Sequence, residues 1–131
     1  MSVEPGYLDI HIYQGSNYAI DITVQDESGA YRDFSGESPT SLVHMDIRTH
    51  EQEVTPTATW ESPVEIKLYE GSATNPNIKI DVGANATTAI PAGVYVYDME
   101  LTRDGVVERL LEGILTVHRS ITRSNDTIAS Y

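Results

Sequence analysis

The sequence predicts an all-β fold, a sandwich of two antiparallel sheets built from about seven or eight short strands. Apolar and polar residues alternate with a period of two along most of the chain. Turn segments rich in Gly, Asn, Ser and Pro recur roughly every ten residues. Only residues 84–90 could form a helical turn, which Pro91 would end. Strand spacing alone does not separate a sandwich from a small barrel.

The N-terminal part predicts two strands, over residues 7–13 and 18–24. Between them, residues 14–17 read Gln-Gly-Ser-Asn, which is turn chemistry. The second strand is half-buried, because one set of its residues is apolar and the other is small or polar. The apolar set is Tyr18, Ile20, Ile22 and Val24.

The middle of the chain predicts a strand over 41–48 whose residues Val43, Met45 and Ile47 face the core. Residues 55–60 and 65–69 are expected to form a pair of strands, with Pro56 and Pro63 at edges or breaks. Residues 78–82 alternate in one more short strand. The segment 70–77 is a loop by composition.

The C-terminal part predicts a hairpin of strands 94–102 and 106–117. A three-residue loop, 103–105, with Gly105 in the left-handed conformation would connect them. This register places Leu101 opposite Val107, Tyr97 opposite Leu111 and Tyr95 opposite Gly113. A two-residue loop would instead oppose Leu101 with Glu108 and mix buried with solvated faces, so we expect the longer loop.

The length and composition of the chain limit the classes of protein to which it can belong. A chain of 131 residues fits one domain, and its lack of cysteine leaves no disulfide or thiolate zinc site. No secretory signal or membrane-length apolar run is visible, so we expect a soluble protein made in a reducing cytosol. We expect a β-sandwich domain over 1–117 and a C-terminal arm over 118–131.

The net charge of -12 lies entirely in residues 1–102, which hold 16 acidic and 4 basic residues. Binding to phosphate backbones depends on Lys and Arg, so nucleic acid and anionic membranes are not expected partners. The charge has two interpretations: it keeps the protein soluble, or an acidic face docks a basic partner.

Candidate catalytic and metal-ligating residues are scarce. The four histidines are scattered singly along the sequence, and His44 with Asp46 on one strand face is the nearest approach to a ligand pair. The acid pairs Asp26-Glu27 and Glu51/Glu53 fall in predicted turns, where solvated acids are normal. No nucleophile elbow or phosphate-binding loop is present. The sequence therefore predicts no catalytic residue, no metal and no cofactor.

Aromatic residues are mostly tyrosine, eight against one Phe and one Trp. Tyrosine suits half-buried sheets and protein interfaces, and Tyr95 and Tyr97 are expected in the core or at its rim. Sugar stacking by tyrosine or Trp60 is an alternative, which would make the chain a carbohydrate-binding module.

Residues 118–131 break the alternation and are poor in apolar residues. They are either a frayed tail or an arm that orders against a neighbouring subunit. In the second case the candidate partner-binding residues are Ile121, Arg123, Ile128 and Tyr131.

Several segments, taken in order, resemble one family. "YQGSNYAIDITVQDESG" from Tyr13 is similar to its opening, "YRDFSG" to its next turn, and "LVHMDIR" to a strand ending M-x-I-R. "TTAIPAGVYVYD" over 87–98 resembles its signature T-x-x-(L/I)-P-A-G-x-Y-x-Y-D. "LLEGILTV" and "ITR" resemble its closing strand and terminus. The family is an immunoglobulin-like structural domain of tailed phages, found at the N-terminus of baseplate upper proteins and as free-standing virion proteins of cyanophages.

The resemblance covers nearly the whole chain. It implies a non-enzymatic virion protein, made in the host cytoplasm, whose partners are other virion proteins or further copies of itself. Tail, baseplate or fibre attachment is expected, with capsid decoration or a neck position as alternatives. The chain departs from the family at Arg32 in the "YRDFSG" turn and in a longer insertion around 61–77. From another class, a hydrolase would need a pocket with converging acids.

Overall fold

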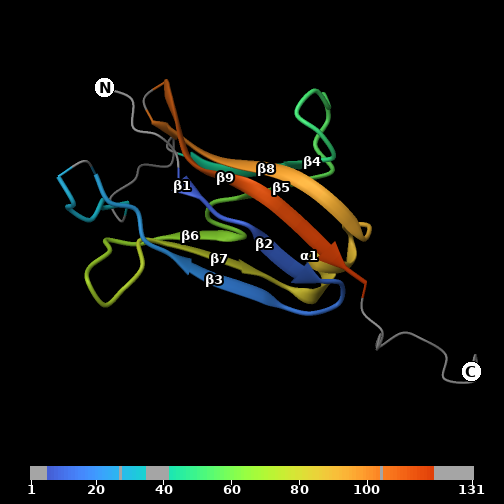
Figure 1. Cartoon of the computed structure of the whole chain (residues 1–131). Helices are drawn as coiled ribbons and strands as arrows, with labels where there is room; N and C mark the ends of the chain where they lie inside the picture. The colour runs from blue at the N-terminus through green and yellow to red at the C-terminus, as the bar shows by residue number, and fades with distance from the viewer. Residues whose placement is uncertain (1–5, 27, 35–41, 104, 120–131) are drawn as a thin grey trace, which may run out of the picture.

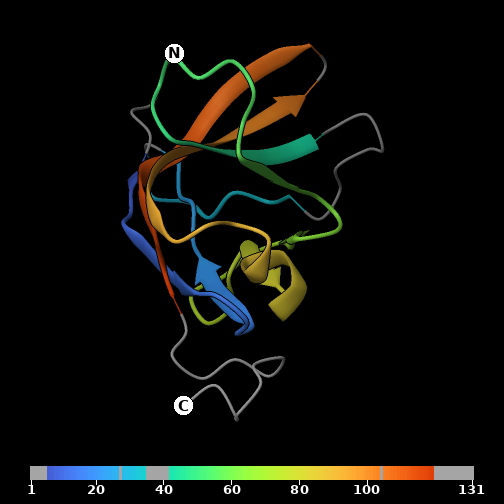
Figure 2. The same ribbon diagram turned by 90° about the vertical axis from the view of Figure 1, so that its right-hand side faces the viewer.

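The computed structural model describes residues 6–26, 28–34, 42–103 and 105–119. Two sheets pack face to face in a β-sandwich, as predicted (Figure 1). The view turned by 90° shows the same two layers, joined by chain that crosses from one sheet to the other (Figure 2). The alternation with a period of two therefore gives each sheet one apolar face, and the two apolar faces form the core.

The larger sheet has the order β1-β9-β8-β4-β5, and β2 also pairs with β9. The pairs formed by β4, β5, β8 and β9 among themselves are antiparallel, whereas β1 and β2 run parallel to β9. Its strands are β1 (Gly6–Tyr7), β2 (Ile10–Tyr13), β4 (Leu42–Arg48), β5 (Ala58–Glu61), β8 (Gly93–Arg103) and β9 (Val106–His118).

The smaller sheet is antiparallel, in the order β3-β7-β6. It consists of β3 (Tyr18–Ile22), β6 (Ile66–Leu68) and β7 (Ile78–Val82). The predicted helical turn is α1 (Ala84–Thr88), which follows β7 and precedes β8.

The core contains the inward-facing residues that the alternation predicts. In β4, Val43, Met45 and Ile47 are fully buried. Tyr95 and Tyr97 of β8 are also buried, which confirms their expected place. The other large, fully buried side chains are Phe34, Ile10, Ile12, Ile66, Ile78, Ile80, Ile90, Met99 and Leu115.

The N-terminal strand is interrupted, so the described residues form nine strands where seven or eight were expected. The break at Leu8 and Asp9 lies where the chain crosses Gly113 of β9. A β-carbon at position 113 would lie 2.1 Å from the Leu8 carbonyl oxygen. The parallel pairing also departs from the expected antiparallel sheets. It arises because β1 and β2 join β9 instead of β3.

The expected pairing of segments 55–60 and 65–69 is wrong. Strand β5 pairs with β4 in the larger sheet, whereas β6 pairs with β7 in the smaller one. Trp60 and Ile66 are both buried, and they enter the same core from opposite sheets. The chain changes layer between these residues because both apolar side chains can then be buried.

The predicted register of the C-terminal hairpin is also wrong. Arg103 pairs with Val106, so the turn has two residues, and Leu101 does lie opposite Glu108. A β-bulge then changes which residues of β9 face the core. The register shifts between Met99 and Glu100, and β9 contributes one extra residue there. As a result two consecutive leucines of β9 are buried, Tyr97 lies opposite Gly113 and Tyr95 opposite Leu115.

An ion pair explains how Glu108 is tolerated opposite the buried Leu101. Its carboxylate lies 2.5 Å from the Arg32 guanidinium, in an ion pair that is partly exposed. The longer loop was expected because a two-residue loop with one unbroken register would mix buried and solvated faces. One inserted residue in β9 restores the buried face of the strand beyond the bulge.

Candidate functional site

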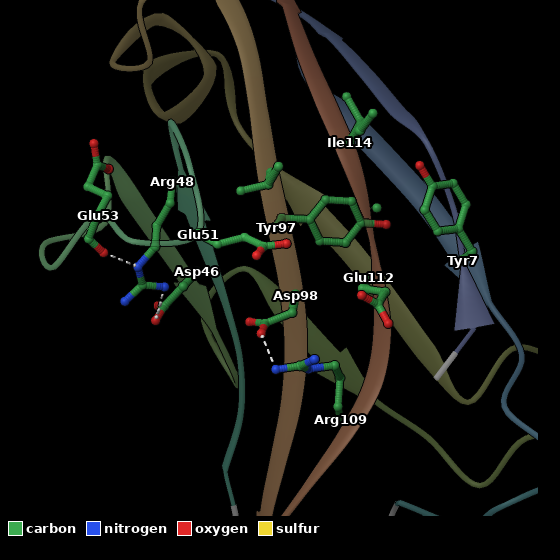
Figure 3. A pocket seen from close by; sticks show the side chains of 12 residues that line it. Tyr7, Asp46, Arg48, Glu51, Glu53, Tyr97, Asp98, Arg109, Glu112 and Ile114 are labelled. Atoms are coloured by element: carbon green, nitrogen blue, oxygen red, sulfur yellow. Dashed lines mark hydrogen bonds and ion pairs between the residues drawn. The ribbon is translucent and has the colours of Figure 1, made fainter. Parts of the chain in front are cut away.

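The outer face of the larger sheet carries a groove of about 570 Å³ (Figure 3). Strands β4, β8 and β9 form its floor. The loop between β4 and β5 (residues 49–57) borders it on one side, and Tyr7 of β1 on the other. Its lining includes five carboxylates and two arginines, which gives a net charge of -3.

Three of the carboxylates form a row across the sheet. Asp46 of β4 lies directly opposite Asp98 of β8, and Asp98 lies directly opposite Glu112 of β9. Cross-strand neighbours project from the same face, so the three acids share the outer surface. Like charges placed directly opposite each other destabilise a sheet. This row therefore has a cost in folding free energy.

The two arginines neutralise only part of the row. The Arg48 Nη1 atom lies 3.0 Å from Asp46 Oδ2, and its Nε donates a hydrogen bond of 2.9 Å to the Glu53 carbonyl oxygen. The Arg109 Nη2 atom lies 3.2 Å from Asp98 Oδ2. Neither arginine forms an ion pair with Glu112, as Figure 3 shows.

Glu53 fixes the loop that borders the groove. Its carboxylate accepts hydrogen bonds from the Thr49 backbone N–H and hydroxyl and from the Thr57 hydroxyl. The Thr49 hydroxyl bond lowers the pKa of Glu53 below its usual value. Glu53 is therefore both an anion and a structural residue. The side chain of Glu51 extends from the same loop toward the groove (Figure 3).

The floor also has apolar parts. Val96 and Ile114 line the groove between the acids, and Ile114 is 39% exposed. Beneath them the Tyr97 hydroxyl donates a hydrogen bond to the Leu8 carbonyl oxygen. Burial raises the pKa of Tyr97 well above its usual value, so this hydroxyl keeps its proton. The groove thus combines negative charge with apolar surface.

The net negative charge of the groove favours the binding of a cationic group. Asp46 accepts a hydrogen bond from Arg48, and Asp98 forms an ion pair with Arg109. Among the described residues, no group of three or more His, Cys, Asp or Glu could hold a metal ion.

Sequence reasoning missed this groove. Glu51 and Glu53 were assigned to a turn, which is correct, and both residues also line the groove. Asp46 was placed on one strand face with His44, and only the pairing of β4 with β8 reveals that Asp98 is its neighbour. Alternation predicts the face of a residue and does not predict its cross-strand partner.

Other candidate residues have different outcomes. Asp26 does lie in a turn, where its carboxylate accepts bonds from Ser28 and Ala30. Trp60 is only 3% exposed, so the suggestion that it stacks on sugars is wrong. The arm residues Ile121, Arg123, Ile128 and Tyr131 lie outside the described part of the chain.

The expectation that the histidines stand apart is wrong for one pair. The His11 Nδ1 and His118 Nε2 atoms are 2.9 Å apart. These residues are separated by 107 positions in sequence, and the parallel pairing of β2 with β9 brings them together. His44 lies 3.7 Å from Glu100 on the outer face of the larger sheet, and its Nδ1 has no hydrogen-bond partner.

Comparisons with known proteins add little. No family model and no curated protein matches the chain. A solved structure from photo-crosslinking work on cell-adhesive interactions of VGSC beta subunits is similar at 12% identity and a TM-score of 0.42. The match covers 93% of this chain and 99% of that one. Within the described residues no helix has the length and apolar character to cross a membrane.

Proposed function

We propose that this chain is a non-enzymatic protein–protein interaction module, and more specifically a structural component of a tailed-phage virion. One observation carries the proposal: the row Asp46, Asp98 and Glu112 is kept across the outer face of the larger sheet with incomplete neutralisation. A face that served stability alone would alternate acids with bases.

A basic segment of a partner protein explains the row. Complementary charge raises the association rate and selects among partners. An arginine or lysine in the groove would meet Glu112, which neither Arg48 nor Arg109 neutralises. Val96 and Ile114 in the floor of the groove would add an apolar contact. Apolar contacts from which water is excluded provide most of the affinity of a protein interface.

Nucleic acid and anionic lipid fit the groove poorly, because its net charge of -3 repels phosphate. Because Trp60 is buried, the aromatic side chain expected to stack on a sugar is not accessible to a carbohydrate partner. A basic protein surface or extended basic segment is therefore the partner that the groove fits best.

The assignment to a virion is supported by the ordered resemblance to phage immunoglobulin-like domains. The residues that carry the resemblance have structural roles in the sandwich. The Tyr95 hydroxyl donates a 2.6 Å hydrogen bond to the Pro91 carbonyl oxygen, which fixes the entry to β8. Tyr97 and Gly113, from two separate segments of the resemblance, lie opposite each other.

The segment 118–131 is proposed as a second interface, apart from the groove. Its proposed contact residues are Ile121, Arg123, Ile128 and Tyr131. Strand β9 ends at His118, so this segment leaves from an end of the larger sheet and not from the groove. Two separate interfaces, the groove and this segment, would allow one small domain to connect two larger virion proteins.

A competition experiment tests the proposal. Wild-type chain and a Glu112→Lys variant would be co-expressed during particle production, and their ratio in purified particles measured by mass spectrometry. We expect the variant to be depleted in particles relative to the cell extract. The matched control is Asp81→Lys, which makes the same charge change on the exposed face of the smaller sheet.

The outcomes separate the two levels of the proposal. Absence of the wild-type chain from particles would overturn the virion assignment. Equal incorporation of both variants with wild type would overturn the assignment of the groove as the interface. Circular dichroism of the purified variants establishes that each is folded.

A further inference from the structure

The free edge of the smaller sheet is not used by the proposed function. Strand β3 lies at this edge, and within the described residues its only partner strand is β7. The two strands that precede it, β1 and β2, both join β9 in the larger sheet, so neither pairs with β3. The smaller sheet therefore ends in a strand with one open side (Figure 1).

The hydrogen bonds of the smaller sheet show which backbone groups lie on the open side of β3. The Asp81 N–H donates a 2.8 Å bond to the Glu65 carbonyl oxygen, so the odd-numbered residues of β7 direct their backbone groups toward β6. The even-numbered residues of β7 therefore bond to β3, and their cross-strand partners there are also even-numbered. As a result, the backbone N–H and C=O groups of Ala19 and Asp21 point away from the sheet.

The core is also open along this edge. Ile20 and Ile22 of β3 point inward but are only partly buried, whereas Ile80 and Ile78, their partners in β7, are fully buried. A groove of about 850 Å³ is lined by Ile22 and the residues after it and by the first part of β9. Val107 of β9 lines this groove and is largely exposed. An apolar opening thus lies beside unpaired backbone groups.

We propose that the edge of β3 binds an extended segment of a partner protein as a fourth strand of the smaller sheet. The outward N–H and C=O groups recur at every second residue, about 6.8 Å along the strand, which is the spacing that another extended chain presents. Strand addition of this kind derives its affinity from main-chain hydrogen bonds and its specificity from alternate side chains. The edge lacks the usual protection against pairing, because β3 contains no proline and only one charged residue, Asp21.

The edge also specifies the side chains of that segment. Residues of the segment beside Ile20 and Ile22 would point inward, and apolar side chains there would bury more of the open core. Residues beside Ala19 and Asp21 would point to the outer face, where a lysine or arginine would meet the Asp21 carboxylate. We therefore expect a segment in which apolar and polar residues alternate, with a basic residue in the polar set.

A second copy of this chain fits the edge less well. Two copies joined β3 to β3 would bring together two chains that each have a net charge of -12. In such a pair Asp21 would lie opposite an odd-numbered residue of the second β3, and neither of these residues is basic. The charges thus favour a different protein as the partner. The site belongs to the smaller sheet and does not depend on the acidic groove of the larger one.

The test uses the full-length chain and a synthetic peptide, acetyl-Val-Lys-Val-Thr-Val-Lys-Val-amide, in an NMR titration of the backbone amides. We expect saturable binding that shifts the amide signals of Ala19 and Asp21 and slows their hydrogen exchange. The amides of Ile20 and Ile22 already bond to β7 and should exchange slowly without peptide.

Two N-methylated forms of the peptide test whether backbone bonds hold it. One carries the methyl groups on its lysines and threonine, and the other carries them on its valines. The first set provides the bonding N–H groups in an antiparallel pair, and the second set provides them in a parallel pair. Exactly one of the two forms should therefore bind at least roughly tenfold more weakly than the parent peptide.

Ala19→Pro tests the edge from the side of the protein. It removes an outward N–H and no hydrogen bond of the sheet, and it should weaken peptide binding at least roughly tenfold. The matched control is His11→Pro on the free edge of β2. The bonds of the Leu8 and Gln14 N–H groups to β9 show that the His11 N–H also points outward, so this variant should bind the peptide like wild type.

Several outcomes would overturn the proposal. These are the absence of saturable binding to the folded chain, equal affinities of the three peptides, and binding that survives Ala19→Pro. A concentration-dependent dimer of the peptide-free chain that Ala19→Pro dissociates would identify a second copy as the occupant instead. Thermal melts establish whether each variant is folded, and the N-methylated peptides test the same bonds on wild type.

Discussion

Gly113 lies directly opposite Tyr97 across β8 and β9, and the Leu8 carbonyl oxygen occupies the space that a β-carbon at position 113 would need. The same oxygen accepts the Tyr97 hydroxyl hydrogen bond, and the Leu8 N–H donates a 3.0 Å bond to the Glu112 carbonyl oxygen. This crossing point attaches the N-terminal strand to the sheet that carries the groove.

The first prediction concerns this close approach. Gly113→Ala should destabilise the domain by at least about 2 kcal/mol, because the new methyl group meets backbone atoms that have no room to move. Urea unfolding measures the change. Gly83→Ala is the control, since no atom lies within 4 Å of its β-carbon position, and it should cost far less. Equal effects of the two substitutions would contradict the crossing geometry.

The second prediction follows from the raised pKa of Tyr97. Burial keeps the folded tyrosine neutral, whereas the unfolded one ionises near its usual value of about 10. Above that pH the folded state binds more protons than the unfolded state, so the free energy of unfolding falls as pH rises, by up to about 1.4 kcal/mol per pH unit for this group.

Tyr97→Phe should therefore make the loss of stability above about pH 10 shallower, although the variant is less stable at neutral pH by about 1 kcal/mol for the lost hydrogen bond. Urea titrations at a series of pH values provide the measurement. Tyr69→Phe, at an exposed position, is the control and should leave the profile unchanged. An unchanged alkaline slope in Tyr97→Phe would show that this residue does not contribute to it.

The third prediction concerns Asn77, which is fully buried before β7. Its Nδ2 donates hydrogen bonds to the carbonyl oxygens of Val24 (2.7 Å) and Arg32 (2.9 Å), and its Oδ1 accepts one from the Val24 N–H (2.9 Å). Asn77→Ala removes all three bonds, although the Val24 carbonyl oxygen still accepts one from the Arg32 N–H, and it should cost about 3 kcal/mol. Asn85→Ala, at an exposed helical position, should be neutral or slightly stabilising. A loss below about 1 kcal/mol in Asn77→Ala would mean that water replaces the amide.

The fourth prediction measures the cost of the acid row. Glu112→Gln should be neutral or stabilising by a few tenths of a kcal/mol at low salt, since it relieves repulsion with Asp98. Added salt should reduce the gain, because it screens partly exposed charges. Arg109→Gln should be destabilising under the same conditions, since it removes the partner of Asp98. Destabilisation by Glu112→Gln would indicate that this residue serves the fold and not a partner.

Much of the fold could be predicted from the sequence, because alternation decides which residues face the core. The inward set of β4 and the two buried tyrosines of β8 follow from it, and the helical turn follows from the segment that Pro91 ends. Strand partners could not be predicted in the same way. The bulge beside Met99 and the change of layer between Trp60 and Ile66 depend on packing between distant segments.

The candidate site was largely beyond sequence reasoning for the same reason. The acid row joins residues of three strands, and the histidine pair joins the two ends of the domain. The structural role of Asn77 was hidden as well, because composition assigned it to a loop. Its bonds to Val24 and Arg32 arise only when the chain brings those segments beside it.

The central claim is that a protein partner covers the groove, and the absence of cysteine from the chain allows a direct measurement. A single thiol introduced by Ile114→Cys would be labelled with a maleimide in the isolated chain and in its native assembly. Ala19→Cys, exposed on the smaller sheet, is the reference position. We predict that Ile114→Cys is labelled in isolation and protected in the assembly, while Ala19→Cys is labelled in both. Equal labelling of Ile114→Cys in the two states would contradict the account.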